Sequence, residues 1–171
     1  MPNTNTPQGL VPILRGAGGN FAEANLRSKA ATLNARIRIY DAVAPVSDGT
    51  ISRTITPGTT NLLGVAIDGG APLTLTQHHV IEEPDATYAA MVSGATGGLA
   101  ADVFANANLL LGSTSTFISD DQIDQTTIAA TATLDLKLIK RFPEADTTFG
   151  QFSVFEVQIN KTIRDQATAG V

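Results

Sequence analysis

The chain has 171 residues, of which 43% are hydrophobic, and a formal net charge of −5 at pH 7. It contains no cysteine, which excludes disulfide bonds, thiolate catalysis and any zinc site built with sulfur. The length suits one main domain, no run approaches the roughly 18 apolar residues of a membrane span, and the first residues lack the basic and apolar parts of a secretory leader. We therefore expect a protein that is made and kept in solution, without a membrane partner.

The charge is distributed unevenly along the chain. The first 40 residues carry five bases and one acid, whereas the residues after them carry six bases and fifteen acids. A basic segment beside an acidic body can dock on an acidic surface, either of a neighbouring copy or of another protein. The asymmetry therefore indicates an adhesive segment at the N-terminus.

Residues 1–34 are rich in Asn, Thr, Gly and Ala, and three prolines fall within the first dozen positions. Proline imposes extended backbone and glycine permits unusual turns, so the composition predicts an extended, largely irregular N-terminal arm, with one helical turn near residues 21–31. A disordered tail is the alternative. A solvated tail has little use for apolar residues, and the arm contains several of them: Leu10, Val11, Ile13, Leu14, Phe21 and Leu26.

From residue 35 onward, apolar and polar residues alternate, a pattern typical of half-buried strands. The alternation is clearest in residues 35–40 and 130–138, and turn signals separate the candidate strands. Seven or eight short strands predict an all-β fold, a small β-barrel or a compact β-sandwich, over residues 35–171. The segment 99–111 is compatible with either a short helix or two strand ends. The other candidate strands are residues 50–56, 62–67, 73–82, 86–92, 115–118 and 152–160.

Two groups of residues raise the question of a metal site. His78 and His79 are the only histidines, but adjacent side chains of a strand point to opposite faces, so they are not expected to share one ion. Asp120, Asp121 and Asp124 lack the glycine and the terminal glutamate of a calcium loop and predict a solvated acidic turn. We expect no metal and no other cofactor.

The sequence offers no catalytic constellation, and we expect the protein not to be an enzyme. No nucleophile elbow accompanies the histidines, and the glycine groups lack the lysine and hydroxyl residue of a phosphate loop. Glu82 and Glu83 are neighbours, which predicts a soluble sheet edge rather than a pair of carboxylates across a cleft. Nucleic acid is not an expected partner, because the acidic body would repel phosphates and the arm has a single aromatic residue.

Five segments, in order, resemble the head decoration, or cement, proteins of tailed bacteriophages. The likeness extends over most of residues 9–161. Two positions depart from the family pattern: Tyr40 stands where family members usually have glycine before Asp41, and the His78-His79 pair is unusual. The five segments are GLVPILRG (9–16), IRIYDAV (37–43), LGVA (63–66), EPDATY (83–88) and FEVQIN (155–160).

The resemblance implies a small β-barrel on the outer surface of an icosahedral head, synthesised in the host cytoplasm. The N-terminal arm would lie over major capsid proteins, and copies of the protein, as dimers or trimers, would clamp capsomers against internal pressure. Basic residues of the arm would pair with capsid carboxylates, and Phe21 and Leu26 would fill apolar pockets. Carried over by position, the capsid-binding residues are Leu10, Ile13, Leu14, Arg15, Asn20, Phe21, Leu26, Arg27 and Lys29.

A ligand-binding or carbohydrate-binding β module of a virion surface or fibre protein is the alternative. Such a module needs exposed aromatic rings for stacking on sugars. The chain has no tryptophan and only two tyrosines, Tyr40 and Tyr88. The composition therefore favours the capsid accessory protein over the sugar-binding module.

Overall fold

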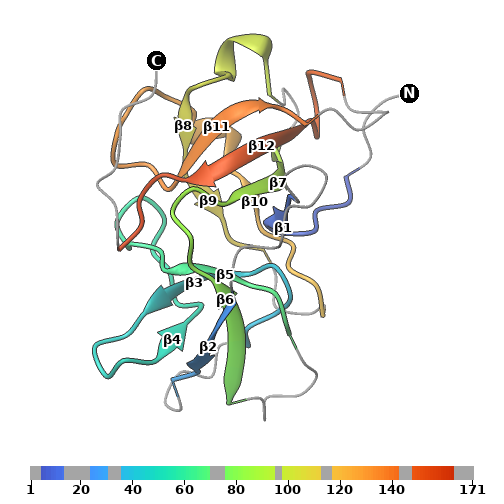
Figure 1. The fold of residues 1–171 in the computed structure, drawn as a ribbon. Coiled ribbons are helices and arrows are strands. Elements are labelled where there is room, and N and C mark those ends of the chain that lie inside the picture. The colour runs from blue at the N-terminus through green and yellow to red at the C-terminus, as the bar shows by residue number, and fades with distance from the viewer. Residues whose placement is uncertain are drawn as a thin grey trace.

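A computed structural model of the chain describes residues 5–13, 24–30, 36–69, 76–94, 98–112, 117–142 and 148–163. The fold is all-β, as the alternating sequence predicts, with a curled sheet that resembles half a barrel (Figure 1). The described strands are β1 (Val11–Pro12), β2 (Ala24–Ser28), β3 (Ala42–Pro45), β4 (Ile51–Ser52), β5 (Gly64–Ala66), β6 (Gln77–Ile81), β7 (Thr87–Met91), β8 (Asn106–Ala107), β9 (Leu109–Leu110), β10 (Gln122–Ile123), β11 (Leu136–Arg141) and β12 (Val154–Ile159). Two 3-10 turns accompany them, η1 (Ala100–Asp102) and η2 (Gln125–Thr127).

The first sheet has the strand order β1-β7-β12-β11-β8, and every neighbouring pair in it is antiparallel. Its clearest strand is β12, in which Phe155, Val157 and Ile159 are buried and the residues between them are partly exposed. This alternation is the one that the sequence predicts for residues 152–160. The physical reason is that one face of β12 packs on the core while the other faces outward.

The second sheet has the order β2-β6-β5-β3-β4, and it curls until its two edges meet. Lys29, directly after β2, forms a parallel bridge with Ile51 of β4, and the Ala30 N–H donates to the Ile51 carbonyl at 3.0 Å. A small apolar cluster of this half is separate from the main core and consists of Ile37, Val43, Ile51, Ala66 and Val80. Figure 1 shows this sheet as the lower half of the molecule.

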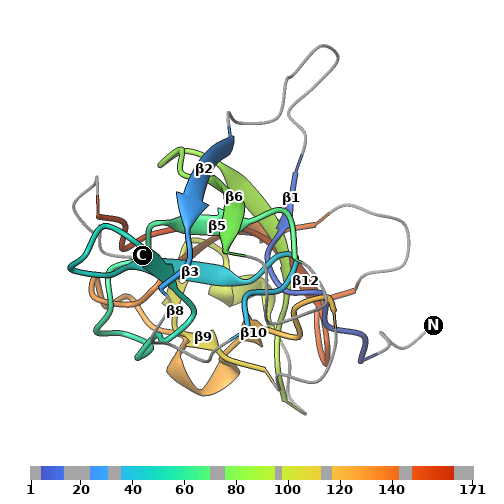
Figure 2. The ribbon, with the colours of Figure 1, turned by 90° about the horizontal axis from the view of Figure 1, so that it is seen from below.

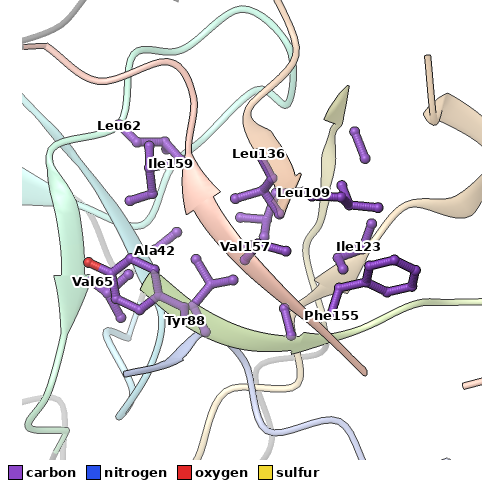
Figure 3. Close-up of a cluster of buried hydrophobic side chains, with 14 of the residues drawn as sticks. Ala42, Leu62, Val65, Tyr88, Leu109, Ile123, Leu136, Phe155, Val157 and Ile159 are labelled. Atoms are coloured by element: carbon purple, nitrogen blue, oxygen red, sulfur yellow. The ribbon is translucent and has the colours of Figure 1, made fainter. Parts of the chain in front are cut away.

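The main core lies between the two sheets (Figure 3). Tyr88 of the first sheet lies beside Ala42 and Val65 of the second sheet, and Phe155 lies at the other side of the cluster, beside Ile123. Leu109 and Ile123, from the two-stranded sheet of β9 and β10, complete the cluster at one side. Burial of a side chain of this size contributes about 1.5 to 3 kcal/mol, so this cluster is the main source of stability.

The prediction of a strand over residues 35–40 is wrong for residues 36–40, the part of it that the structure describes. Residues 36–40 form no strand, although Ile39 makes an isolated parallel bridge with Ile118, and the regular strand begins only at Ala42. Arg38, which the alternation places on the solvent side, is completely buried. The alternation of apolar and polar residues at this point of the chain therefore does not reflect a strand.

Two further strand predictions differ from the structure in their limits. The strand predicted for residues 130–138 begins at Leu136, because residues 132–135 form turns and bends. In the segment 99–111 both alternatives occur, since the 3-10 turn η1 precedes the short strands β8 and β9.

Gly64, the glycine of the LGVA segment, is required by close packing of two backbones. A Cβ atom at Gly64 of β5 would lie 1.9 Å from the carbonyl oxygen of Ile81 in β6, far inside the contact limit. Gly64 therefore allows β5 and β6 to approach at the middle of the second sheet. This gives a structural reason for the glycine in that segment.

Candidate functional site

The described parts of the predicted arm form the edge strands of both sheets. β1 pairs with β7, with Val11 opposite Ala89, and β2 pairs with β6, with Arg27 opposite His78. β6 and β7 follow one another and pass from the lower to the upper half of the molecule as one green segment in Figure 1. Seen from below, β2 lies directly beside β6 (Figure 2). Both described arm segments thus run along the same stretch of the body.

The predicted capsid-binding residues before β2 fall into two groups. Leu10 is completely buried in the main core and is not available to a partner in this structure. Ile13 is partly buried, and its N–H donates to the Thr87 carbonyl at 2.9 Å. The other four, Leu14, Arg15, Asn20 and Phe21, lie outside the described residues, and the division of the chain after residue 34 stays a prediction.

β2 presents an exposed leucine beside a strand edge. The helical turn predicted near residues 21–31 is wrong for β2, which is a strand, and Leu26 at its centre is 53% exposed. Lys29 donates its N–H to Thr76 on the β6 side, so alternation directs the N–H and C=O groups of Leu26 to the other side. On that side, the Lys29–Ile51 bridge ties the end of β2 to β4, and no strand pairing or bridge joins Ala24–Leu26 to another residue that the structure describes.

Arg27 and Glu82 form an ion pair with each other, which the sequence does not predict, and the expected capsid contact of Arg27 stays a prediction. Arg27 does not present a free charge, because its guanidinium forms a two-pronged ion pair with Glu82 of this same chain. The hydrogen bond to Glu82 raises the pKa of Arg27. Glu82, predicted to keep a sheet edge soluble, is buried, and Asn25 also donates to it. The ion pair therefore fastens β2 to the end of β6.

His79 lies directly opposite Leu26 across the β2–β6 pair and shares its exposed face. Its Nδ1 atom is 2.5 Å from a carboxylate oxygen of Asp68, and its backbone N–H donates to the other oxygen at 2.9 Å. His78 points to the opposite face and is buried, as the strand geometry predicts. We call the exposed group of Leu26, His79 and Asp68 the β2 surface.

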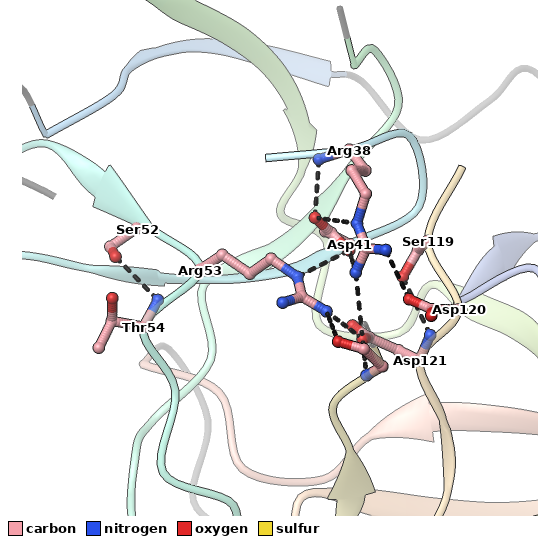
Figure 4. Close-up of polar contacts among 9 residues, drawn as sticks. Arg38, Asp41, Ser52, Arg53, Thr54, Ser119, Asp120 and Asp121 are labelled. Atoms are coloured by element: carbon pink, nitrogen blue, oxygen red, sulfur yellow. Dashed lines mark hydrogen bonds and ion pairs between the residues drawn. The ribbon is translucent and has the colours of Figure 1, made fainter. Parts of the chain in front are cut away.

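A second polar centre consists mostly of buried side chains (Figure 4). Arg53 bridges two carboxylates, with Nε 2.9 Å from Asp41 and Nη2 2.5 Å from Asp121. Arg38 contacts Asp41 and forms an ion pair with Asp120 at 2.5 Å. These five residues join the segment before β3, the end of β4 and the segment before β10.

The expectation of a solvated acidic turn is wrong for Asp121 in this centre. Asp121 is completely buried, accepts the Gly112 N–H at 2.9 Å and pairs with Arg53. Burial raises the pKa of Asp121, and the Arg53 charge opposes this shift. Because both arginines are committed to carboxylates, the centre is suited to holding segments together rather than to binding a ligand. The third carboxylate of that group, Asp124, accepts the Thr126 N–H at the start of η2.

Within the described segments, no group of three or more His, Cys, Asp or Glu side chains could hold a metal ion. The described residues also contain no helix long and apolar enough to cross a membrane. Of the two tyrosines considered for sugar stacking, Tyr88 is fully buried, and burial raises the pKa of its hydroxyl.

Comparison with known proteins adds no family assignment. No protein-family model matches the chain, and no curated protein matches it either.

Two features of the site have no direct signal in the sequence. The Asp68–His79 contact joins residues separated by a segment that contains a proline and two glycines, and nothing in the sequence pairs them. The buried centre has no indication either, because Arg38 lies between two isoleucines in an alternating segment that assigns it to the solvent side.

Proposed function

We propose that this protein is a structural accessory protein of a phage head, a decoration or cement protein. It binds the outer surface of the shell and clamps neighbouring major capsid proteins, and copies of it associate as a homo-oligomer. The proposal is supported by the resemblance of five ordered segments and by the exposure of part of the arm on the β2 surface. Multiple copies on a symmetric shell convert weak individual contacts into tight binding.

The observation that carries the proposal is the combination of a strand edge and an exposed leucine in the predicted capsid-binding segment. Backbone groups at a strand edge can pair with an extended segment of a partner, and an apolar side chain beside them supplies a hydrophobic contact. Leu26 is the predicted capsid-binding residue that offers both in the described part of the arm. The other basic residue of this region, Lys29, is partly exposed at the end of β2.

The backbone at Tyr40 also supports the resemblance. Tyr40 has φ of 68°, in the left-handed region that favours glycine, and it occupies the position where family members usually carry glycine. The local geometry of the family's turn is thus compatible with this chain despite the substitution. The structural need for Gly64 in the LGVA segment is a second point of agreement.

The test is co-sedimentation with phage capsids prepared without the decoration protein. Deletion of the arm is a poor variant, because it removes Leu10 and Ala30 from buried positions and uncovers the edges of β6 and β7. Leu26→Asp is better, since the side chain is exposed. Leu99→Asp is the matched control: Leu99 is 55% exposed and precedes η1, the turn at the opposite end of the molecule from β2 in Figure 1.

We expect the wild-type protein and Leu99→Asp to bind the shell at a fixed number of copies and to raise its melting temperature. Leu26→Asp should bind about 30-fold more weakly, the effect of losing a contact of about 2 kcal/mol. If wild-type protein does not bind capsids, the capsid assignment is wrong. If the two aspartate variants bind equally, the shell contact lies elsewhere.

A further inference from the structure

The β2 surface contains an imidazole held in a defined orientation beside its apolar residue. The His79 ring is 54% exposed, and its Nδ1 atom lies 2.5 Å from Asp68. The backbone N–H of His79 donates to the same carboxylate, so Asp68 is fixed to this residue twice. Leu26 is the cross-strand neighbour of His79. A partner that covers Leu26 therefore also covers His79 and Asp68.

The hydrogen bond determines where the imidazole carries its proton. An ionised carboxylate only accepts hydrogen bonds, so Nδ1 of His79 is the donor and keeps its proton in both charge states. The Nε2 atom is the one that gains or loses a proton with pH. With neutral His79, the pair carries the full negative charge of Asp68, whereas with charged His79 the pair has no net charge.

Few other charges face this pair from the elements packed against it. From β2, the residues on the same face are Ala24, Leu26 and Ser28, and the Arg27 charge lies on the other face, paired with Glu82. On β6, His78 is buried on that other face, with its Nδ1 3.2 Å from the Asp68 carbonyl and 3.4 Å from its carboxylate. From the end of β5, Asp68 is the charged residue that contacts His79. Among the described residues, two groups lie within ion-pair distance of the Asp68 carboxylate: His79 on the exposed face and the buried His78, and only the His79 ring is open to a partner.

We propose that docking of the β2 surface is coupled to protonation of His79. This inference rests on the proposed function and concerns the regulation of the same surface. Covering Leu26 removes water from the Asp68 carboxylate, which is 41% exposed, and an isolated buried carboxylate is costly. A charged imidazole neutralises it within the interface, so the complex favours the protonated form. The affinity for the shell therefore rises as the pH falls.

The experiment measures the dissociation constant for decoration-free capsids at about pH 6 and about pH 8, for wild type and for His79→Gln. Glutamine keeps a donor toward Asp68 and does not titrate. His78→Gln is the matched control, because it removes the neighbouring histidine and leaves His79 in place. Melting temperatures of the free proteins at both pH values establish that each variant is folded.

We expect wild-type protein and folded His78→Gln to bind about tenfold more tightly at the lower pH, equivalent to about 1.4 kcal/mol. The dissociation constant of His79→Gln should change less than about twofold between the two pH values. Equal pH dependence in wild type and His79→Gln would overturn the coupling, as would a pH dependence lost only in His78→Gln. These outcomes all include shell binding, so they are distinct from a failure of the proposed function, in which wild type binds at neither pH.

Discussion

Tyr40 shows how a single residue can carry strain that its neighbours compensate. Its φ of 68° lies where residues with a Cβ atom cost about 1 to 2 kcal/mol. The turn is held by hydrogen bonds on both sides of the peptide, since the Tyr40 N–H donates to Ala66 and its carbonyl accepts from Leu10. The alternation of residues 35–40 predicts extended backbone at this position and gives no sign of the turn.

We expect Tyr40→Gly to be more stable than Tyr40→Ala by about 0.5 to 1 kcal/mol. Both variants lose the ring, but glycine alone relieves the left-handed strain. The greater conformational freedom of glycine in the unfolded chain offsets part of this stabilisation. Urea denaturation of the two variants measures the difference. A more stable alanine variant would show that Tyr40 is not strained in solution.

At the scale of the element, the attachment of β2 depends on a charge pair that is buried on one side. The Glu82 side chain is 1% exposed and that of Arg27 is 37% exposed. Loss of one partner of such a pair leaves a buried charge without compensation. Lys140 and Glu156, on β11 and β12, form an ion pair at 3.1 Å whose lysine is mostly exposed, and pairs of this kind contribute little.

Arg27→Met should lower the free energy of unfolding by about 2 kcal/mol, because Glu82 then remains buried and charged. Adding Glu82→Gln to this variant should restore most of the loss. Lys140→Met serves as the comparison and should change the stability by less than about 0.5 kcal/mol. Chemical denaturation at neutral pH gives all of these values, and similar losses for Arg27→Met and Lys140→Met would contradict the burial of Glu82.

The success of the sequence-based predictions also varied at the level of the element. β12 was predictable because its alternation comes from its own two environments, one buried and one open. The sequence predicts an irregular arm with a helical turn in place of β2, because the conformation of β2 is set by pairing with β6, about 50 residues later in the chain. The sequence pattern assigns Glu82 and Asp121 to the solvent, because the arginines that pair with them in the fold are also distant in sequence.

At the scale of the whole molecule, Asp135 connects three regions that must be together in the folded state. Its carboxylate accepts N–H groups from Gly58 in one turn and from Leu109 in β9, and it directly precedes β11. Burial raises the pKa of Asp135, and the hydrogen bonds from Leu109 and Gly58 oppose this shift. Global stability should therefore depend on the protonation of this group.

Because the folded state raises this pKa, the protonated form of Asp135 favours folding. Its contribution is fully present below the ordinary value of about 3.9 and is lost as the pH rises through the raised folded value. The difference in unfolding free energy between wild type and Asp135→Asn should thus fall as the pH rises above about 4. A difference that rises over this range would mean that the hydrogen bonds to the carboxylate outweigh its burial.

The pairing of β1 with β7 and of β2 with β6 also constrains how the molecule is made. Val11 meets Ala89 and Arg27 meets His78, so β1 and β2 are synthesised well before the strands with which they pair. Contacts so distant in sequence form slowly. Until β1 and β2 have docked, the edges of β6 and β7 are exposed and can pair with other unfinished chains. High expression at elevated temperature should therefore favour aggregates over folded protein, and slower synthesis in the cold should increase the soluble yield.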